Sequence, residues 1–225
     1  MPQLSIIVPV YNEARTIRQI LEKINSVDID KEIIVVDDGS SDGTDKILRD
    51  INYSNLKIIH HSSNRGKGAA FLTGLANAIG EFVIIQDADL EYEPNDYLRL
   101  ITAIKEEKRD LVLGARFQEG HHGLFMHRLG NRFLTSLLNL LFKSHLNDYL
   151  TCYKLARKST WDTLNLKALR FDIDAEIVCK VLKKKLRILE IPIAYYPRTY
   201  KAGKKIRWRD GLWAIFCLFK YRVLD

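Results

Sequence analysis

The chain has 225 residues, of which 47% are hydrophobic and 28% charged, which excludes a disordered tail and fits one large domain or two small ones. Its formal charge is +7, and the segment 183–225 carries 12 lysine and arginine residues against three acidic ones. This basic segment predicts an anionic partner such as phosphate, nucleic acid or an acidic membrane face, although a basic surface that only keeps the protein soluble would look the same.

The cysteines and the apolar runs indicate where the protein resides. The three cysteines are far apart and form no CxxC pair, which argues against a disulfide framework or a zinc site. Met1-Pro2-Gln3 leads directly into an apolar run, without the basic region and cleavage site of a signal peptide. The apolar run 212–219 has eight residues, whereas a membrane span needs about 20. We therefore expect a cytoplasmic protein that stays in solution or rests on the cytoplasmic face of a membrane.

The first half of the chain alternates short apolar runs with amphipathic stretches. Runs rich in Ile and Val predict buried strands at 4–10, 32–38, 56–60 and 81–87. Helices are predicted near 13–25, 43–51 and 66–79. This alternation predicts an α/β fold with a mostly parallel central sheet and helices on both faces. Ligands of such sheets bind beyond the carboxyl ends of the strands, so the segments that follow the strands form the candidate site.

The second half is less regular. Helices are predicted near 95–108, 124–143, 157–164, 174–185 and 208–222, and strands at 111–116 and 187–193. The helices at 124–143 and 208–222 are amphipathic, and the second mixes aromatic with basic residues. Because no internal repeat or low-complexity linker divides the chain, we expect a single domain over 1–225.

The strand at 81–87 runs into the acidic triplet Asp87-Ala88-Asp89. Two carboxylates two positions apart can reach one hard cation when the chain between them is extended and turning, and Mg²⁺ and Mn²⁺ prefer such oxygen ligands. Glu91 is two residues further along and could add a third oxygen. The competing interpretation is a pair of aspartates that only caps a loop.

Two further polar segments follow predicted strands. Asp37-Asp38-Gly39-Ser40 carries carboxylates that could accept hydrogen bonds from a base or a ribose, but turn formation, with Thr44 capping the next helix, is the competing interpretation. Asn64-Arg65-Gly66-Lys67-Gly68 is glycine-rich and basic before a helix, as in loops that cradle phosphate. It lacks the Walker A spacing, and a flexible helix start would look the same.

Basic residues in the second half are candidates for binding phosphate groups, because a guanidinium grips phosphate oxygens in pairs. They are Arg116, Arg198, Lys201, Lys204, Lys205, Arg207 and Arg209. For any single lysine of this set, solubility is the simpler explanation.

Taken together, these segments resemble glycosyltransferase family two. The motifs PVYNE, DDGSSDGT, NRGKGAA, QDADLEYEP and GAR follow one another between Val8 and Arg116, and their combination is specific. The later segments DYLTCYK, FDIDAEI and YYPRTYKAGKKIRWRDG are similar to the branch that uses polyprenyl phosphates, as in dolichol-phosphate mannose synthase. The resemblance covers nearly the whole chain. It implies the GT-A fold, with a nucleotide-sugar and metal-binding half at 1–116 and an acceptor-binding half at 117–225.

The resemblance also implies roles for individual residues. The nucleoside pocket would be lined by Pro9, Tyr11, Glu13, Val36 and Asp38. Asp87 and Asp89 would hold the metal and the donor diphosphate, with Glu91 as a further ligand, although relatives often carry Gln at that position. Lys67 and Ala88 are further candidate donor contacts. The acceptor phosphate or the leaving group would be bound by Arg116, Arg198 and a lysine of the pair Lys204/Lys205.

The implied reaction is an inverting transfer of a hexose from GDP-mannose or UDP-glucose, with Mg²⁺ or Mn²⁺ neutralising the leaving group. A polyprenyl phosphate acceptor, dolichyl or undecaprenyl, is already anionic and needs no general base. The alternative acceptor is a sugar or polysaccharide hydroxyl, which needs one. The candidate base is then Asp148, just before the strand-like TCYK segment, against a purely structural hydrogen-bonding role. The basic segment 195–211 favours the phosphate.

The two amphipathic helices would suit contact with an anionic membrane surface. Packing on the core or on a partner subunit explains them equally well, so an oligomer is also compatible with the sequence. Nucleic acid is not expected as a partner, because it would not explain the carboxylates after the second and fourth strands.

Overall fold

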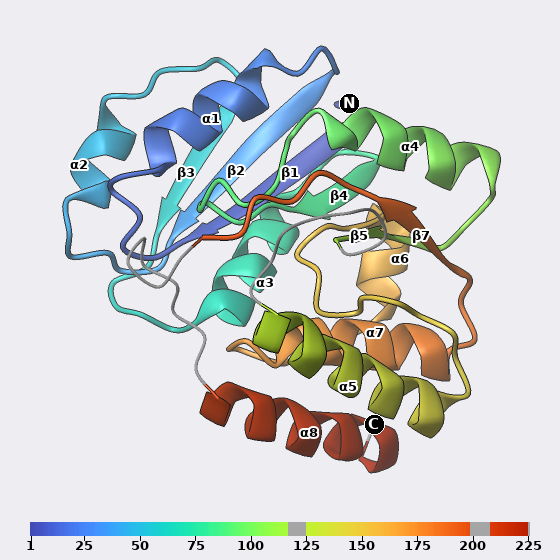
Figure 1. The fold of residues 1–225 in the computed structure, drawn as a ribbon. Helices are drawn as coiled ribbons and strands as arrows, with labels where there is room; N and C mark the ends of the chain where they lie inside the picture. Colours follow the sequence, from blue (N-terminus) through green and yellow to red (C-terminus); the bar gives the residue numbers. More distant parts are fainter. Residues whose placement is uncertain (117–124, 199–207, 225) are drawn as a thin grey trace.

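The computed structural model describes residues 1–116, 125–198 and 208–224, and its elements follow the predicted alternation (Figure 1). The strands are β1 (Leu4–Val10), β2 (Lys31–Asp37), β3 (Leu56–His60), β4 (Phe82–Ile85), β5 (Leu111–Ala115), β6 (Lys154–Arg157) and β7 (Ile188–Pro192). The helices are α1 (Ile17–Ser26), α2 (Thr44–Arg49), α3 (Lys67–Asn77), α4 (Asp96–Glu106), α5 (Phe125–Phe142), α6 (Lys158–Thr163), α7 (Ile173–Lys183) and α8 (Trp208–Val223). Every helix and strand predicted from the sequence overlaps one of these elements.

The strands in the described part of the chain form one seven-stranded sheet in the order β3-β2-β1-β4-β6-β5-β7. β1 pairs in parallel with β2 and β4, β2 with β3, and β5 with β7, so the predicted mostly parallel sheet is confirmed. β6 runs antiparallel to both of its neighbours, β4 and β5. Because β6 is reversed, its amino end lies beside the carboxyl ends of those strands. The segment that precedes it, with Asp148, therefore reaches the same edge of the sheet as Asp87.

Helices cover both faces of the sheet, as predicted (Figure 1). α1, α2 and α4 lie on one face, α3 and α6 lie on the other, and α5, α7 and α8 form a further layer beyond α3 and α6. Side chains of β1 and β2, including Ile6, Ile7, Ile33 and Ile34, are fully buried between the helices. Burial on both faces explains why these strands read as continuous apolar runs.

The helices α5, α7 and α8 pack on one another through a second apolar cluster, separate from the sheet core. Leu138, Val178, Cys179 and Cys217 are fully buried there. Cys152 is also buried, and all three cysteines are free thiols. Across the described residues, none of the helices combines the length and the hydropathy that crossing a membrane would require.

Candidate active site

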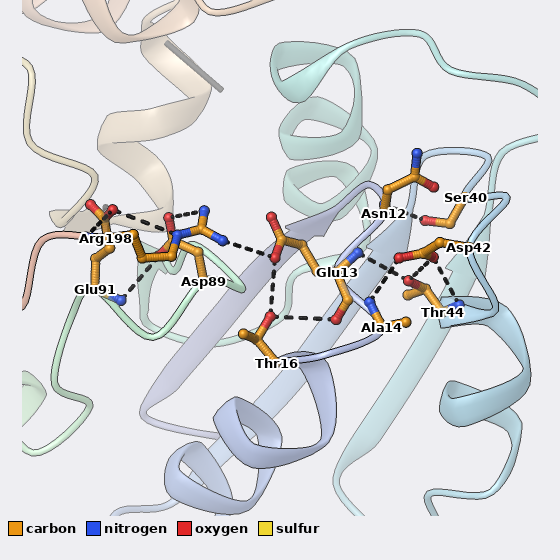
Figure 2. A network of polar contacts seen from close by, with 10 residues as sticks. All are labelled: Asn12, Glu13, Ala14, Thr16, Ser40, Asp42, Thr44, Asp89, Glu91 and Arg198. Atoms are coloured by element: carbon orange, nitrogen blue, oxygen red, sulfur yellow. Dashed lines mark hydrogen bonds and ion pairs between the residues drawn. The ribbon is translucent and has the colours of Figure 1, made fainter. Parts of the chain in front are cut away.

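Loops that follow β1, β2 and β4 meet at the carboxyl edge of the sheet, where the sequence predicted the site (Figure 2). The loop after β1 is fastened to the turn after β2, because the backbone amides of residues 12–14 donate to Ser40, Thr44 and Asp42 over 2.9–3.0 Å. Thr44 was predicted to cap a helix, but it is the first residue of α2 and its hydroxyl accepts from the Glu13 amide. This fastening fixes the backbone of Glu13, whose side chain points toward Arg198 (Figure 2).

Arg198 is the centre of a polar cluster that joins the loops after β1 and β4. Its guanidinium lies 3.2 Å from Oε2 of Glu13 and 2.8 Å from Oδ2 of Asp89 (Figure 2). Its backbone amide donates to Oε1 of Glu91 over 2.9 Å, and its Nε is 3.6 Å from the same oxygen. The hydroxyl of Tyr195 donates to the other oxygen of Glu91 over 2.6 Å. Three carboxylates from two loops therefore share one guanidinium.

Asp87 has a different partner, Lys67, which is the first residue of α3. The Nζ of Lys67 lies 2.8 Å from Oδ1 of Asp87 and 3.8 Å from Oδ2 of Asp174. Asp174, in the first turn of α7, is also 2.6 Å from the Nζ of Lys154, whose side chain is fully buried. Four alternating charges thus run from β6 through α7 and α3 to the loop after β4.

The two aspartates of the acidic triplet differ in proton affinity. Burial, followed by the negative charges of Asp87 and Glu91, raises the pKa of Asp89 to about 7 in spite of Arg198. Burial alone would also raise the pKa of Asp87, but the ammonium of Lys67 outweighs it and the pKa lies below its usual value. Burial would lower the pKa of Lys67, but Asp87 and Asp174 hold it well above its usual value. Asp89 therefore lies where further positive charge would be stabilising.

Asp87 and Asp89, which follow β4, offer carboxylate oxygens of the kind that Mg²⁺ and Mn²⁺ bind. Both are hard ligands on either side of the buried Ala88, and the negative charges of Asp87 and Glu91 add to the effect of burial in raising the pKa of Asp89. Glu91 fits less well, because Tyr195 and Arg198 engage both of its oxygens. Among the residues that the structure describes, no three His, Cys, Asp or Glu side chains are grouped as a ready metal site. One ion could bind both aspartates only if their present cations gave way.

The predicted nucleoside pocket is only partly open. Asp38 is buried, and its carboxylate accepts hydrogen bonds from the backbone amides of Arg65 and Gly66 over 2.9 and 2.7 Å and contacts His61. These contacts let Asp38 hold the NRGKG loop, and its contact with a base or ribose stays a prediction. Val36 is fully buried in the sheet.

The remaining three residues of that predicted pocket are more open. Tyr11 is exposed, and Pro9 and Glu13 are partly buried. All three lie at or just beyond the carboxyl end of β1, so their contact with a nucleoside stays a prediction.

Two glycines of the NRGKG loop are required by close packing against the backbone of Ala168 and Leu169. Gly66 has a φ of +102°, and a Cβ added there would lie 2.4 Å from the carbonyl oxygen of Leu169. At Gly68 an added Cβ would lie 2.2 Å from the carbonyl oxygen of Ala168. The amide of Gly66 is bound to Asp38, so the predicted phosphate cradle is not formed by this amide. Lys67 is the residue of the loop that faces the acidic triplet.

Asp148 and Arg116 form a buried pair. Nε and Nη2 of Arg116 donate to the two oxygens of Asp148 over 2.7 and 2.8 Å, and Asn131 donates to Asp148 over 2.9 Å. The Asp148 side chain is 1% exposed. These contacts do not support the predicted role of Asp148 as a general base, because its carboxylate is shielded and both of its oxygens are engaged. Arg116 directs two of its nitrogens at Asp148, so these contacts do not support its predicted binding of phosphate.

Sequence reasoning missed Lys154, Asp174 and Tyr195 as members of the site. The available signal for Lys154 was its place between Cys152-Tyr153 and Leu155-Ala156, because an ammonium buried among such residues needs an acidic partner. Asp174 was visible within FDIDAEI, but the sequence does not tell which acid of that segment faces Lys67. The predicted phosphate ligands Lys204 and Lys205 lie outside the described residues.

Comparison with known protein families decides the class of this chain. Residues 5–164 match the model of Glycosyl transferase family 2. The chain belongs to glycosyl transferase family 2. The matched range runs from β1 to the end of α6 and contains Lys67, Asp87, Asp89 and the Arg116–Asp148 pair, so the resemblance found in the motifs is confirmed.

Curated relatives of this family 2 chain include named transferases. The UDP-N-acetylglucosamine–dolichyl-phosphate N-acetylglucosaminyltransferase of Methanococcus voltae is 30% identical over 221 residues, with 88% of each chain covered. The low-salt glycan biosynthesis hexosyltransferase Agl6 of Haloferax volcanii is 26% identical over 209 residues, which cover 90% of this chain and 50% of that protein. The chain thus spans about half the length of Agl6. These names are consistent with the polyprenyl-phosphate branch.

Solved structures with the same fold include proteins in complex with a nucleotide or a nucleotide sugar. Glucosyl-3-phosphoglycerate synthase of Mycobacterium tuberculosis, in complex with Mn²⁺, UDP and phosphoglyceric acid, has a TM-score of 0.76 at 18% identity, covering 100% of this chain and 80% of that one. TarS of S. aureus in complex with UDP-GlcNAc has a TM-score of 0.66 at 21% identity, covering 97% and 66%. At such identities the likeness shows the fold, and the predicted GT-A fold is confirmed.

Proposed function

We propose that this family 2 enzyme is an inverting, metal-dependent transferase that moves a hexose from a nucleotide diphosphate sugar to a polyprenyl phosphate. The observation that carries the proposal is the meeting of Asp87 and Asp89 with Lys67 and Arg198 at the carboxyl edge of the sheet. Two carboxylates can hold a divalent ion, and two cations can offset the charge of phosphate groups on both substrates.

Uridine diphosphate is the better supported leaving group. The M. voltae relative is named for UDP-N-acetylglucosamine, and structures of the M. tuberculosis synthase contain UDP with Mn²⁺ or Mg²⁺. By analogy, Asp87 and Asp89 would hold such an ion beside the donor diphosphate, and the ion would offset the charge that builds on the leaving group. This support shifts the predicted choice between UDP-glucose and GDP-mannose toward a uridine donor.

A phosphate acceptor fits the state of the carboxylates at this edge. The carboxylates around the acidic triplet and the two arginines are each engaged by a lysine or an arginine: Glu13, Asp87, Asp89, Glu91 and Asp148. A hydroxyl acceptor needs a carboxylate that is ready to take its proton, whereas a phosphate oxygen is already anionic. The ion pairs therefore favour the phosphate over the hydroxyl.

In the proposed step, an oxygen of the acceptor phosphate attacks the anomeric carbon from the face opposite the leaving diphosphate. A new C–O bond forms as the C–O bond to the diphosphate breaks, and the bonding electrons leave with the nucleoside diphosphate. The configuration inverts, and no proton has to move. Lys67 and Arg198 would reduce the repulsion between the two anionic groups.

A polyprenyl acceptor lies in a membrane, and the outer faces of α5 and α8 suit contact with one. On α8, Leu212, Trp213, Phe216 and Phe219 are between 47% and 59% exposed. Further exposed apolar side chains on α5 are Leu129, Phe133 and Leu140. A helix that shows large apolar side chains to solvent in a basic chain is typical of peripheral contact with an anionic leaflet. We propose that this surface rests on the cytoplasmic face of a membrane.

The decisive experiment measures transfer of radiolabelled sugar into an organic-extractable product. UDP-glucose, UDP-N-acetylglucosamine and GDP-mannose are each offered with Mn²⁺ and either dolichyl or undecaprenyl phosphate, and Asp89→Ala serves as the control. Label in the lipid phase from one donor, absent in the variant and with EDTA, is the expected result. Donor hydrolysis without lipid product would instead point to a different acceptor.

Flotation with liposomes tests the membrane contact separately. The wild-type protein should float with anionic liposomes at low salt, and the double variant Phe216→Ser/Phe219→Ser should float at least about tenfold less, because two large apolar side chains no longer enter the leaflet. Leu98→Ser on α4 is the matched control, because Leu98 is exposed on the other face of the sheet. Equal flotation of all three proteins would contradict the proposal, and a concentration-dependent dimer would favour a second copy as the partner.

A further inference from the structure

Asp174 contacts both lysines of the site, Lys67 and Lys154, although it was assigned no role in donor binding. Its carboxylate lies 2.6 Å from the Nζ of Lys154 and 3.8 Å from the Nζ of Lys67. The Lys154 side chain is fully buried, and its ammonium also donates to the carbonyl oxygen of Thr151. Asp174 lies in the first turn of α7, where the helix dipole favours a negative charge. These contacts hold the Asp174 side chain in place beside Lys67, the lysine that pairs with Asp87 of the acidic triplet.

Lys67 therefore lies between two carboxylates at unequal distances. Asp87 is the near partner at 2.8 Å, and Asp174 is the far partner at 3.8 Å. The lysine side chain is 15% exposed, so bulk water can replace only part of a lost ion pair. If Asp87 turned to another cation, the ammonium of Lys67 would still face Asp174.

We propose that Asp174 is a positioning residue that shares Lys67 with Asp87, so that Asp87 can release the lysine and bind a divalent metal. This inference rests on the proposed metal-dependent donor site and assigns the residue that makes the exchange of partners possible. Lys67 stays in the site during the exchange, charged and directed at the place where the donor diphosphate would lie. Lys154 keeps Asp174 from moving fully onto Lys67.

The inference predicts that substitutions of Asp174 and of Lys154 have different effects on the affinity for Mn²⁺. In Asp174→Asn, Lys67 keeps Asp87 as its only carboxylate among these four residues, so Asp87 should bind metal less readily. The dissociation constant for Mn²⁺ measured in the presence of UDP should rise about tenfold, a usual size for coupling between sites. In Lys154→Met, Asp174 loses its nearer cation and should draw Lys67 away from Asp87. That dissociation constant should stay the same or fall.

A matched control separates this effect from simple loss of stability. Lys180 is a buried lysine on α7, paired with Glu176 at 2.8 Å, a partner outside the pairs made by Lys67. Lys180→Met should lower the melting temperature as Lys154→Met does, because each leaves a buried carboxylate with one cation fewer. It should leave the affinity for Mn²⁺ and UDP unchanged.

The experiment is calorimetric titration of Mn²⁺ into each full-length protein with saturating UDP, repeated with GDP, and with melting temperatures recorded alongside. A weaker affinity in Asp174→Asn alone supports the inference. Equal weakening in Asp174→Asn and Lys154→Met, or in Asp174→Asn and Lys180→Met, overturns it. If Asp174→Asn does not fold, Asp174→Glu shifts the carboxylate by one methylene, and an affinity equal to that of the wild type then counts against the inference.

The same titration separates this inference from the proposed function. A wild-type protein that binds Mn²⁺ and a nucleotide but transfers no sugar to polyprenyl phosphate would contradict the proposed acceptor, while the order of affinities among the variants still decides the role of Asp174. A wild-type protein that binds no Mn²⁺ with either nucleotide overturns both.

Discussion

Arg116 and Arg198 both bind carboxylates at the carboxyl edge of the sheet, but they bind them in different ways. Arg116 grips the two oxygens of Asp148 with two nitrogens, and the carboxylate is 1% exposed. Arg198 divides its guanidinium among Glu13, Asp89 and Glu91, and the Asp89 side chain is 16% exposed. In the first arrangement one carboxylate receives two parallel hydrogen bonds from the guanidinium, whereas in the second three carboxylates divide the guanidinium among them.

We interpret this difference as a division of roles between an arginine that stabilises the fold and an arginine that takes part in the reaction. If the buried carboxylate of Asp148 lost Arg116, its negative charge would stay in the interior without a cation. A shared guanidinium at the solvent edge can give up one carboxylate and keep the others, so metal or phosphate groups can enter. We therefore expect Arg116 to matter mainly for stability and Arg198 mainly for transfer.

The largest expected effect is the loss of unfolding free energy when the pair of Arg116 and Asp148 is broken. Arg116→Leu should lower the free energy of unfolding by about 3–5 kcal/mol, because Asp148 would remain buried without its cation. Urea denaturation followed by circular dichroism measures the change. The double variant Arg116→Leu/Asp148→Leu should recover much of the loss, because it removes both charges. A loss below about 1 kcal/mol in the single variant would show that the pair is not structural.

The next effect is on the shared arginine. Arg198→Leu should reduce sugar transfer about 100-fold, the usual result of removing one group that stabilises charge in a transition state. Its loss of unfolding free energy should be smaller than that of Arg116→Leu, since its carboxylates are more open to water. Initial rates with saturating donor measure the first quantity, and urea denaturation the second. If the Arg198→Leu protein unfolded easily but transferred sugar at the wild-type rate, Arg198 would matter for stability and not for transfer.

A smaller effect is expected at Tyr195, which touches both arginine sites. Its ring lies 5.2 Å from the guanidinium carbon of Arg116, and its hydroxyl donates to Glu91. Tyr195→Phe should keep the ring contact and remove the hydrogen bond, at a cost of about 1 kcal/mol in unfolding free energy. Thermal and urea denaturation check this value. A loss as large as that of Arg116→Leu would mean that the hydroxyl holds more than Glu91.

The smallest effect should come from an arginine pair that is open to solvent. Arg157 and Glu81 form an ion pair in which each side chain is 47% exposed. Glu81→Gln should change the free energy of unfolding by no more than about 0.5 kcal/mol, because water screens both charges. The same urea assay applies. A larger loss would show that the exposure of the side chains does not predict the order of the stability losses at Arg116, Arg198 and Arg157.

Much of this fold could be predicted from the sequence because its signals are local. Continuous apolar runs such as 4–10 predicted buried parallel strands, and strand ends placed the acidic residues at one edge of the sheet. The motifs between Val8 and Arg116 indicated family 2 for the same reason, since each is a short stretch of contiguous residues. The sequence therefore determined the fold class, the family and the position of Asp87 and Asp89.

Only the tertiary structure decided which charges are paired. Asp148 was predicted as a candidate base from its position before a strand, but its side chain is 1% exposed and bound by Arg116 and Asn131. Asp174 and Lys67 are more than 100 residues apart in the chain, and α7 brings them to 3.8 Å. Ion pairs of this kind depend on distance through space and on exclusion of water, and no local pattern of residues encodes either quantity.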